Sequence, residues 1–80
     1  MNITMTHLEN VACEAKAEGF QLIVEVMTPG LTVPEVIINR TENIDAKMEY
    51  YRNAYTEDLK LKNNENVYIT KAYAGLILTD

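Results

Sequence analysis

The chain has little of the chemistry that enzymes and metal proteins use most. Its 80 residues include one cysteine, one histidine and no tryptophan. A single cysteine cannot form an intramolecular disulfide, and a structural zinc site needs several cysteine or histidine ligands. His7 and Cys13 are six residues apart, so on one helix they point in different directions and form no catalytic dyad. We expect no metal and no cofactor, a solvated His7 and a half-buried Cys13.

Glycine and long apolar runs are also scarce. The three glycines stand singly at the boundaries of predicted elements, so the sequence contains no glycine-rich phosphate loop. No apolar run approaches the roughly 18 residues of a membrane span, and the chain does not begin with a charged-then-apolar signal segment. We therefore expect one domain over residues 1–80, located in the cytoplasm and without membrane contact.

Positive charge is the minority. Twelve acidic residues face seven lysines and arginines, which gives a net charge of -5 and a pI near 4.7. Such a chain repels a phosphate backbone, so direct nucleic-acid binding is disfavoured and a basic protein partner is tolerated. The acidic pairs Asp45 with Glu49 and Glu57 with Asp58 lie on a predicted helix surface, where no pocket shifts a pKa for acid-base work. The sequence therefore indicates a protein that is not an enzyme.

What the chain does contain is strong helical periodicity between Asn43 and Leu59. Asn43 is a favourable N-cap, and Asp45 suits the positive end of the helix dipole. The apolar positions follow at steps of four or three and predict one buried stripe, made of Ile44, Met48, Tyr51, Tyr55 and Leu59.

A first helix is expected near the N-terminus. Thr6-His7-Leu8-Glu9 has the form of a capping box, and Gly19 can supply a left-handed C-terminal cap. The apolar stripe of this helix is narrow and rich in alanine, and consists of Leu8, Val11, Ala12 and Ala15.

Two strands should form a hairpin after this helix. Phe20 to Met27 alternates, with one fully apolar face made of Phe20, Leu22, Val24 and Val26. Thr28-Pro29-Gly30-Leu31 suits a type II turn, and Val33 to Asn39 reads as the second strand. Because Pro34 has no amide proton, it belongs either on an outer strand of the sheet or at the start of a strand.

A third strand is expected from Val67 to Ala74, after a polar connector at residues 63–66. Val67 and Ile69 should face inward. Gly75 interrupts the run, and Leu76-Ile77-Leu78 is either a bulged continuation of the strand or a docking tail.

These elements predict an α+β fold in the order α-β-β-α-β. The right-handed crossover rule favours a three-stranded sheet of order 2-1-3, with both helices packed on one face. The other face would stay open and would carry Ile23, Glu25 and Met27, a mixed apolar and acidic surface. We interpret it as a candidate surface for a partner or for a homodimer.

The five tyrosines are explained either as core residues with hydroxyls at the surface or as recognition residues. For recognition, the outer side of the second helix offers the most suitable combination of side chains. The predicted partner-binding residues are Glu49, Tyr50, Arg52, Asn53 and Glu57.

The segment PEVIIN at Pro34 to Asn39, followed by Asn43, Ala46-Lys47, Tyr50-Tyr51, Tyr55 and Leu59, resembles small uncharacterised prophage proteins of Gram-positive bacteria. The strand QLIVEV at Gln21 to Val26 and the helix start at Glu42-Asn43 are similar to a phage anti-CRISPR protein that inhibits Cas9. That resemblance implies DNA mimicry by aligned carboxylates, although Lys60 and Lys62 replace the acidic run expected after the helix.

Two functional hypotheses follow. The first is a non-enzymatic phage or prophage accessory protein in the host cytoplasm. It acts on a host or phage protein, such as a defence or nucleic-acid enzyme, through an acidic surface. The alternative is a homodimeric structural domain that associates through the open sheet face or the C-terminal Leu76-Ile77-Leu78 segment.

Overall fold

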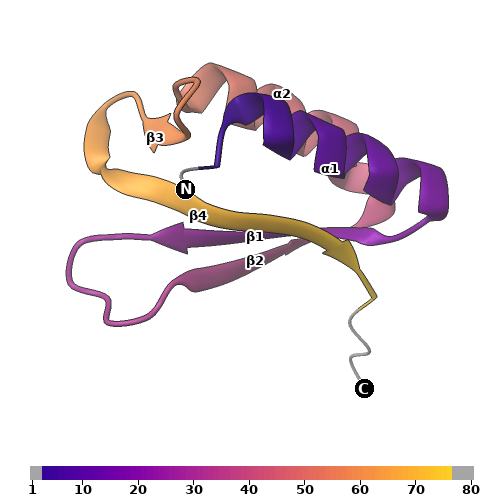
Figure 1. The fold of residues 1–80 in the computed structure, drawn as a ribbon, viewed down its shortest axis with the longest axis horizontal. Helices are drawn as coiled ribbons and strands as arrows, with labels where there is room; N and C mark the ends of the chain where they lie inside the picture. Colours follow the sequence, from indigo (N-terminus) through magenta and orange to yellow (C-terminus); the bar gives the residue numbers. More distant parts are fainter. Residues whose placement is uncertain (1–2, 77–80) are drawn as a thin grey trace.

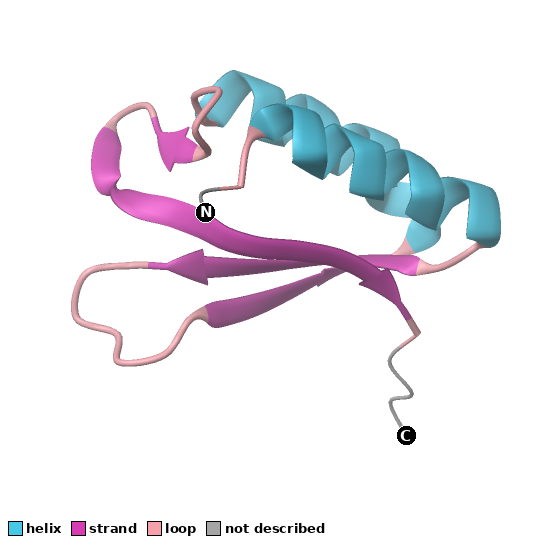
Figure 2. Cartoon of the chain, in the orientation of Figure 1, coloured by secondary structure: helices cyan, strands magenta, loops and turns pink. Residues whose placement is uncertain are grey.

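The computed structural model describes residues 3–76. Two helices cover one face of an antiparallel sheet, and no element among the described residues covers the other face (Figure 1; Figure 2). The elements in chain order are α1 (Met5–Glu18), β1 (Gln21–Met27), β2 (Glu35–Asn39), the short 3-10 helix η1 (Thr41–Asn43), α2 (Ile44–Ala54), β3 (Lys60–Leu61) and β4 (Asn64–Gly75).

The sheet has the order β2-β1-β4-β3, and its three pairs of neighbouring strands are antiparallel. The α+β class, the two helices on one face and the central position of β1 are confirmed. The prediction of three strands is wrong, because the two-residue strand β3 adds a fourth at one edge. Two residues are too short to show alternation, so no sequence pattern marks this strand.

Helix α1 begins two residues before the position that a capping box at Thr6 would set. Thr4 is the N-cap, and its hydroxyl accepts a hydrogen bond from the amide of His7 at 3.4 Å. The amide of Met5 donates to the carbonyl of Glu57 at 2.8 Å, so tertiary contact satisfies another free donor of the first turn. At the other end, Gly19 adopts φ 72°, which confirms the left-handed cap.

Helix α2 ends at Ala54, so the predicted extension of the helix to Leu59 is wrong. Tyr55 is already extended and forms a β-bridge with Leu61, and the amide of Lys62 donates to the carbonyl of Ala54. Leu59 has φ 60°, a left-handed conformation within the turn that leads to β3. The five residues of the predicted stripe are nevertheless all buried, because the turn returns Tyr55 and Leu59 to the same core.

The core lies between the helices and the sheet. Its strand residues include Leu22, Val24 and Val26, as predicted, while Phe20 packs at its margin. The one buried polar residue among residues 3–76 is Asn39, whose amide nitrogen donates to the carbonyl of Leu22 and to the hydroxyl of Tyr51, both at 3.2 Å.

The β1–β2 connection contains the predicted turn. The amide of Leu31 donates to the carbonyl of Thr28 at 3.2 Å, and Gly30 has φ 90°. Strand β2 begins at Glu35 rather than at the predicted Val33, directly after Pro34. It is an edge strand, which agrees with the presence of Pro34 beside it.

Strand β4 is longer than predicted and contains a bulge. Residues 64–66, expected in a connector, belong to the strand. Val26 pairs with Ile69 and Glu25 pairs with Lys71, so Thr70 is the extra residue. The strand ends at Gly75; Leu76 is exposed, and Ile77 and Leu78 of the predicted tail lie outside the described residues.

Candidate protein interaction surface

The uncovered side of the sheet is the most distinctive surface of the molecule. Directly opposed residues of antiparallel strands share a face. The register therefore places β2, β1 and β4 side chains in rows such as Ile38-Ile23-Tyr73 and Val36-Glu25-Lys71. We call this surface the open face, defined by Ile23, Glu25, Met27, Val36, Ile38, Tyr68, Lys71 and Tyr73.

Four of these residues expose large apolar groups. Val36 is 51% exposed, Ile38 41%, Tyr68 40% and Tyr73 42%. Ile23 lies between Ile38 and Tyr73 in the register and is buried although it faces away from the helices. Apolar side chains gathered on one face of a small domain make that face a candidate interaction surface, whereas scattered ones need no explanation.

The polar groups of the open face interact with one another. The hydroxyl of Tyr73 donates to Oε2 of Glu25 at 3.1 Å. This hydrogen bond to the Glu25 carboxylate is the main cause of a raised pKa of Tyr73. Lys71 is directly opposite Glu25 in the register, so the face carries one charge of each sign. The net charge of the open face is therefore zero.

The negative charge of the protein lies on the opposite side. Residues 3–19 and 41–59, which form the helix layer, contain eight acidic and three basic residues. This layer therefore has a net charge of -5, while the other described residues, 20–40 and 60–76, include three acidic and four basic residues. The molecule has one acidic side and one neutral, apolar side.

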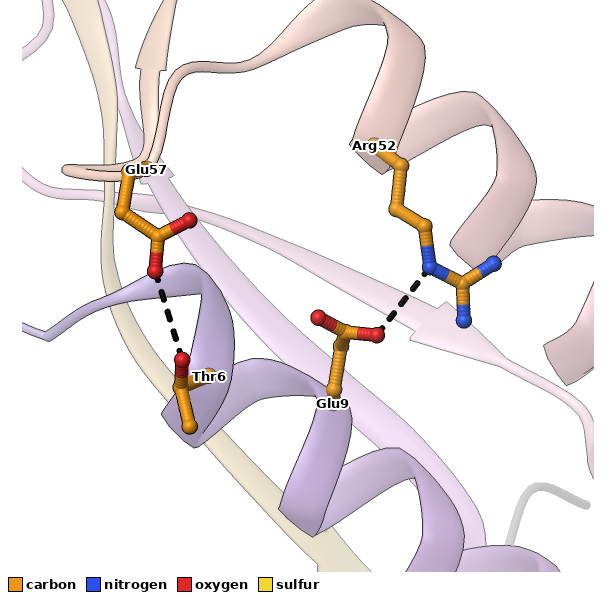
Figure 3. Close-up of polar contacts among 4 residues, drawn as sticks. All are labelled: Thr6, Glu9, Arg52 and Glu57. Atoms are coloured by element: carbon orange, nitrogen blue, oxygen red, sulfur yellow. Dashed lines mark hydrogen bonds and ion pairs between the residues drawn. The ribbon is translucent and has the colours of Figure 1, made fainter.

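The predicted partner-binding residues are divided between two flanks of α2. The Nε of Arg52 donates to Glu9 at 3.2 Å, and Glu57 accepts from the hydroxyl of Thr6 at 3.3 Å, so both side chains point to α1 (Figure 3). Glu57 lies beyond the end of the helix. The side chains of Tyr50 and Arg52 are separated by about 200° around the axis of α2, so Tyr50 lies on the flank away from α1. Glu49 and Asn53 are exposed.

Tyr50 belongs to a cluster of three tyrosine rings. Its ring contacts Tyr51 and Tyr55 edge-on, with centroids 5.5 and 6.4 Å away, and the Nζ of Lys47 lies 5.4 Å from its centroid. Burial raises the pKa of Tyr51, although the hydrogen bond from Asn39 opposes this rise. The pKa of Tyr55 is raised to about 12, mainly by burial and to a smaller extent by neighbouring negative groups. Both hydroxyls are therefore neutral at physiological pH, which suits a structural role.

Residues 3–76 contain no cluster of three or more histidine, cysteine, aspartate or glutamate side chains able to hold a metal ion. Cys13 is exposed, so the expectation of a half-buried thiol is wrong: it follows the buried Ala12 on the outer side of α1. His7 is exposed, as predicted. No helix in this part of the chain is long and apolar enough to cross a membrane.

Sequence reasoning identified Ile23, Glu25 and Met27 as one side of the open face but missed the contributions of β2 and Lys71. Because side chains alternate between the two faces along β2, the outward orientation of Val36 and Ile38 could have been predicted from their positions opposite Glu25 and Ile23. In β4 the bulge at Thr70 breaks the alternation between the two faces of the sheet. The outward orientation of Tyr73 could therefore be predicted only by assuming that Lys71, two residues earlier on the same face, points to solvent.

Comparisons with known proteins give no relative for this chain. No protein-family model matches it, and neither a curated protein nor a solved structure matches it. Surface chemistry is therefore the basis for a functional proposal.

Proposed function

We propose that this protein is a non-enzymatic accessory protein that acts by protein–protein contact, with the open face as its binding surface. The observation that carries the proposal is the combination of four exposed apolar side chains with a net charge of zero on one uncovered sheet face. Its partner is a different protein that presents an apolar patch of similar size.

The composition of the open face supports this assignment. Tyr68 and Tyr73 are large, have only two side-chain torsions and combine an apolar ring with a hydroxyl, which is why tyrosine is enriched at binding hot spots. The pairing of Tyr73 with Glu25 fixes the ring of Tyr73 before a partner arrives. Pre-ordered side chains lower the entropic cost of association.

The proposal is tested by site-specific photocrosslinking in cells that produce the protein. A photoreactive phenylalanine analogue replaces Tyr73 in one variant and Tyr50, which is 50% exposed on the helix layer, in a matched variant. We expect a discrete adduct with one other protein from position 73 and none from position 50. The captured protein, once purified, should bind the unmodified chain saturably at a 1:1 ratio.

Two results would contradict the proposal. An adduct from position 50 alone would place the contact on the helix layer. An adduct at position 73 with the mass of two copies of this chain would instead support the alternative of a homodimer formed through the open face.

The acidic helix layer supports a second candidate function, the inhibition of a basic host defence or nucleic-acid enzyme by a phage-encoded protein. The supporting observation is that this layer holds a net charge of -5. Contact through exposed charges weakens strongly as salt rises, whereas burial of an apolar face does not. Affinity measured at about 50 and 500 mM salt, spanning Debye lengths of about 14 to 4 Å, distinguishes the two surfaces.

A further inference from the structure

Strand β2 is an edge strand with few of the features that protect sheet edges. It ends the strand order, and its register with β1 runs without a shift from Asn39 to Glu35. Its five residues include no lysine and no proline. The opposite edge, β3, has only two residues, one of which is Lys60. An unprotected edge presents a row of backbone N–H and C=O groups to another strand.

A groove of about 470 Å³ lies beside this edge, between β2 and the beginning of α2. Two of its side chains are cationic, Arg40 and Lys47. The two ion pairs found among residues 3–76 use Lys16 and Arg52, so the groove's cations are not in ion pairs in this part of the chain. The lining is completed by Ile37, Ile38, Asn39, Asn43 and Ala46.

We propose that the β2 strand of a second copy of this chain occupies this edge, antiparallel and around a twofold axis at Ile37. Opposed residues of an antiparallel pair must share a face, so a symmetric register is centred on a residue. Centring on Ile37 uses the whole strand. Val36 then lies opposite Ile38 of the second copy, and Glu35 of the second copy lies opposite Asn39.

This register brings opposite charges together. Glu35 shares its side of β2 with Ile37 and Asn39, the side that faces the helix layer. Glu35 of the second copy therefore enters the groove that carries Arg40 and Lys47. By symmetry the contact is made twice. Charge complementarity of this kind selects a copy of the same chain over an unrelated strand.

The same register also buries apolar surface. Val36 and Ile38, both about half exposed, become cross-strand neighbours on the open side of the sheet. The dimer has one continuous eight-stranded sheet, in which both helix layers lie on one side and the two open faces join on the other. The inference does not depend on the proposed function, because it rests on the backbone edge of β2 and its groove, although Val36 and Ile38 also belong to the open face.

Charge reversal and rescue test the inference by sedimentation equilibrium at micromolar to millimolar concentrations. Both E35K and K47E place like charges in the groove, and each should raise the dissociation constant of the dimer by about tenfold, since each affects two symmetric contacts. The double variant E35K/K47E restores opposite charges at positions 35 and 47 with the signs exchanged, while Arg40 is unchanged. We expect its dissociation constant to return to within about threefold of the unmodified protein.

Tyr73→Glu serves as the control, because it charges the open face in the row of Ile38 and Ile23, away from the groove. It should leave the dissociation constant within about threefold. The inference is overturned by a protein that remains monomeric at millimolar concentration. It is also overturned if Tyr73→Glu dissociates the dimer while E35K does not, or if the double variant shows no rescue. Circular dichroism of each variant confirms that the chain is folded.

Discussion

Asn39 joins three elements through a single side chain. It ends β2, and its amide nitrogen donates to the backbone of β1 and to Tyr51 of α2. A buried polar group is tolerated only when it has partners, and both of its hydrogen bonds lie inside the core. The pattern VPEVIIN predicted a strand ending at Asn39 but gave no indication that its last side chain would point inward.

Asn39→Ala should therefore lower the free energy of unfolding by about 2 kcal/mol, because it leaves the carbonyl of Leu22 without this donor. Urea denaturation followed by circular dichroism measures the loss. Asn53→Ala on the exposed side of α2 is the matched control and should change stability by less than about 0.5 kcal/mol. Equal effects in the two variants would refute a structural role for the hydrogen bonds of Asn39.

Tyr55 predicts an alkaline limit of stability. Its pKa is raised from 10.0 to about 12 in the folded chain, first by burial and then by the neighbouring Tyr50, Tyr51 and Glu35. The folded state therefore keeps the phenolic proton at pH values where the unfolded state has lost it. The resulting stabilisation is fully present below about pH 10 and is lost as pH rises through about 12.

Melting temperatures measured from pH 8 to 12 test this dependence. The unmodified protein should lose stability above pH 10, and Tyr55→Phe should show a clearly shallower loss. Tyr51, whose pKa is also raised, accounts for part of the remaining slope. Identical slopes for the two proteins would show that burial of Tyr55 is not linked to its ionisation.

At the scale of elements, Gly19 at the C-terminus of α1 allows the cost of a left-handed backbone conformation to be measured without a steric contribution. Gly19 has φ 72°, and a Cβ added there would meet nothing within 4 Å. Gly19→Ala should cost about 1 kcal/mol through the left-handed conformation alone. Gly75 is the matched control, since an added Cβ would only make ordinary contact with Ile23 at 3.5 Å. Thermal unfolding should show the loss at position 19 and little change at position 75; the reverse order would contradict the assignment of the cap.

Elements with long periodic patterns were predictable, and those formed by tertiary contact were not. β1 and the start of α2 follow directly from apolar spacing. β3 has two residues, and the end of α2 is set by the bridge of Tyr55 to Leu61 rather than by a local breaker. The same holds for α1, whose first amide is satisfied by the carbonyl of Glu57, 52 residues away in the chain.

The candidate site was predictable only in part for a similar reason. Alternation along β1 identified the outward side of the sheet, but the outer side of α2 was equally attractive because its polar residues and Tyr50 are adjacent in the sequence. Arg52 and Glu57 form contacts with α1, so they are separated from Tyr50, which lies on the other flank of α2. Such contacts depend on how α1 packs beside α2, which the spacing of one helix does not specify.

At the scale of the whole molecule, charge and apolar surface are separated onto opposite sides. The helix layer is acidic, while the open face and the β2 edge offer apolar side chains and edge backbone groups. This division is the basis for proposing the open face, rather than the helix layer, as the binding surface. It predicts that charging the open face affects binding far more than stability.

The most direct measurement is the affinity of the purified chain for the protein captured at position 73, compared between Tyr73→Glu and Tyr50→Glu by titration calorimetry. We expect Tyr73→Glu to weaken binding by about a hundredfold, since it would bury a charge in the contact that the open face makes, and Tyr50→Glu to change it by less than about threefold. Both variants should remain folded. Unchanged affinity in Tyr73→Glu, or the larger loss in Tyr50→Glu, would contradict the assignment of the open face as the binding surface.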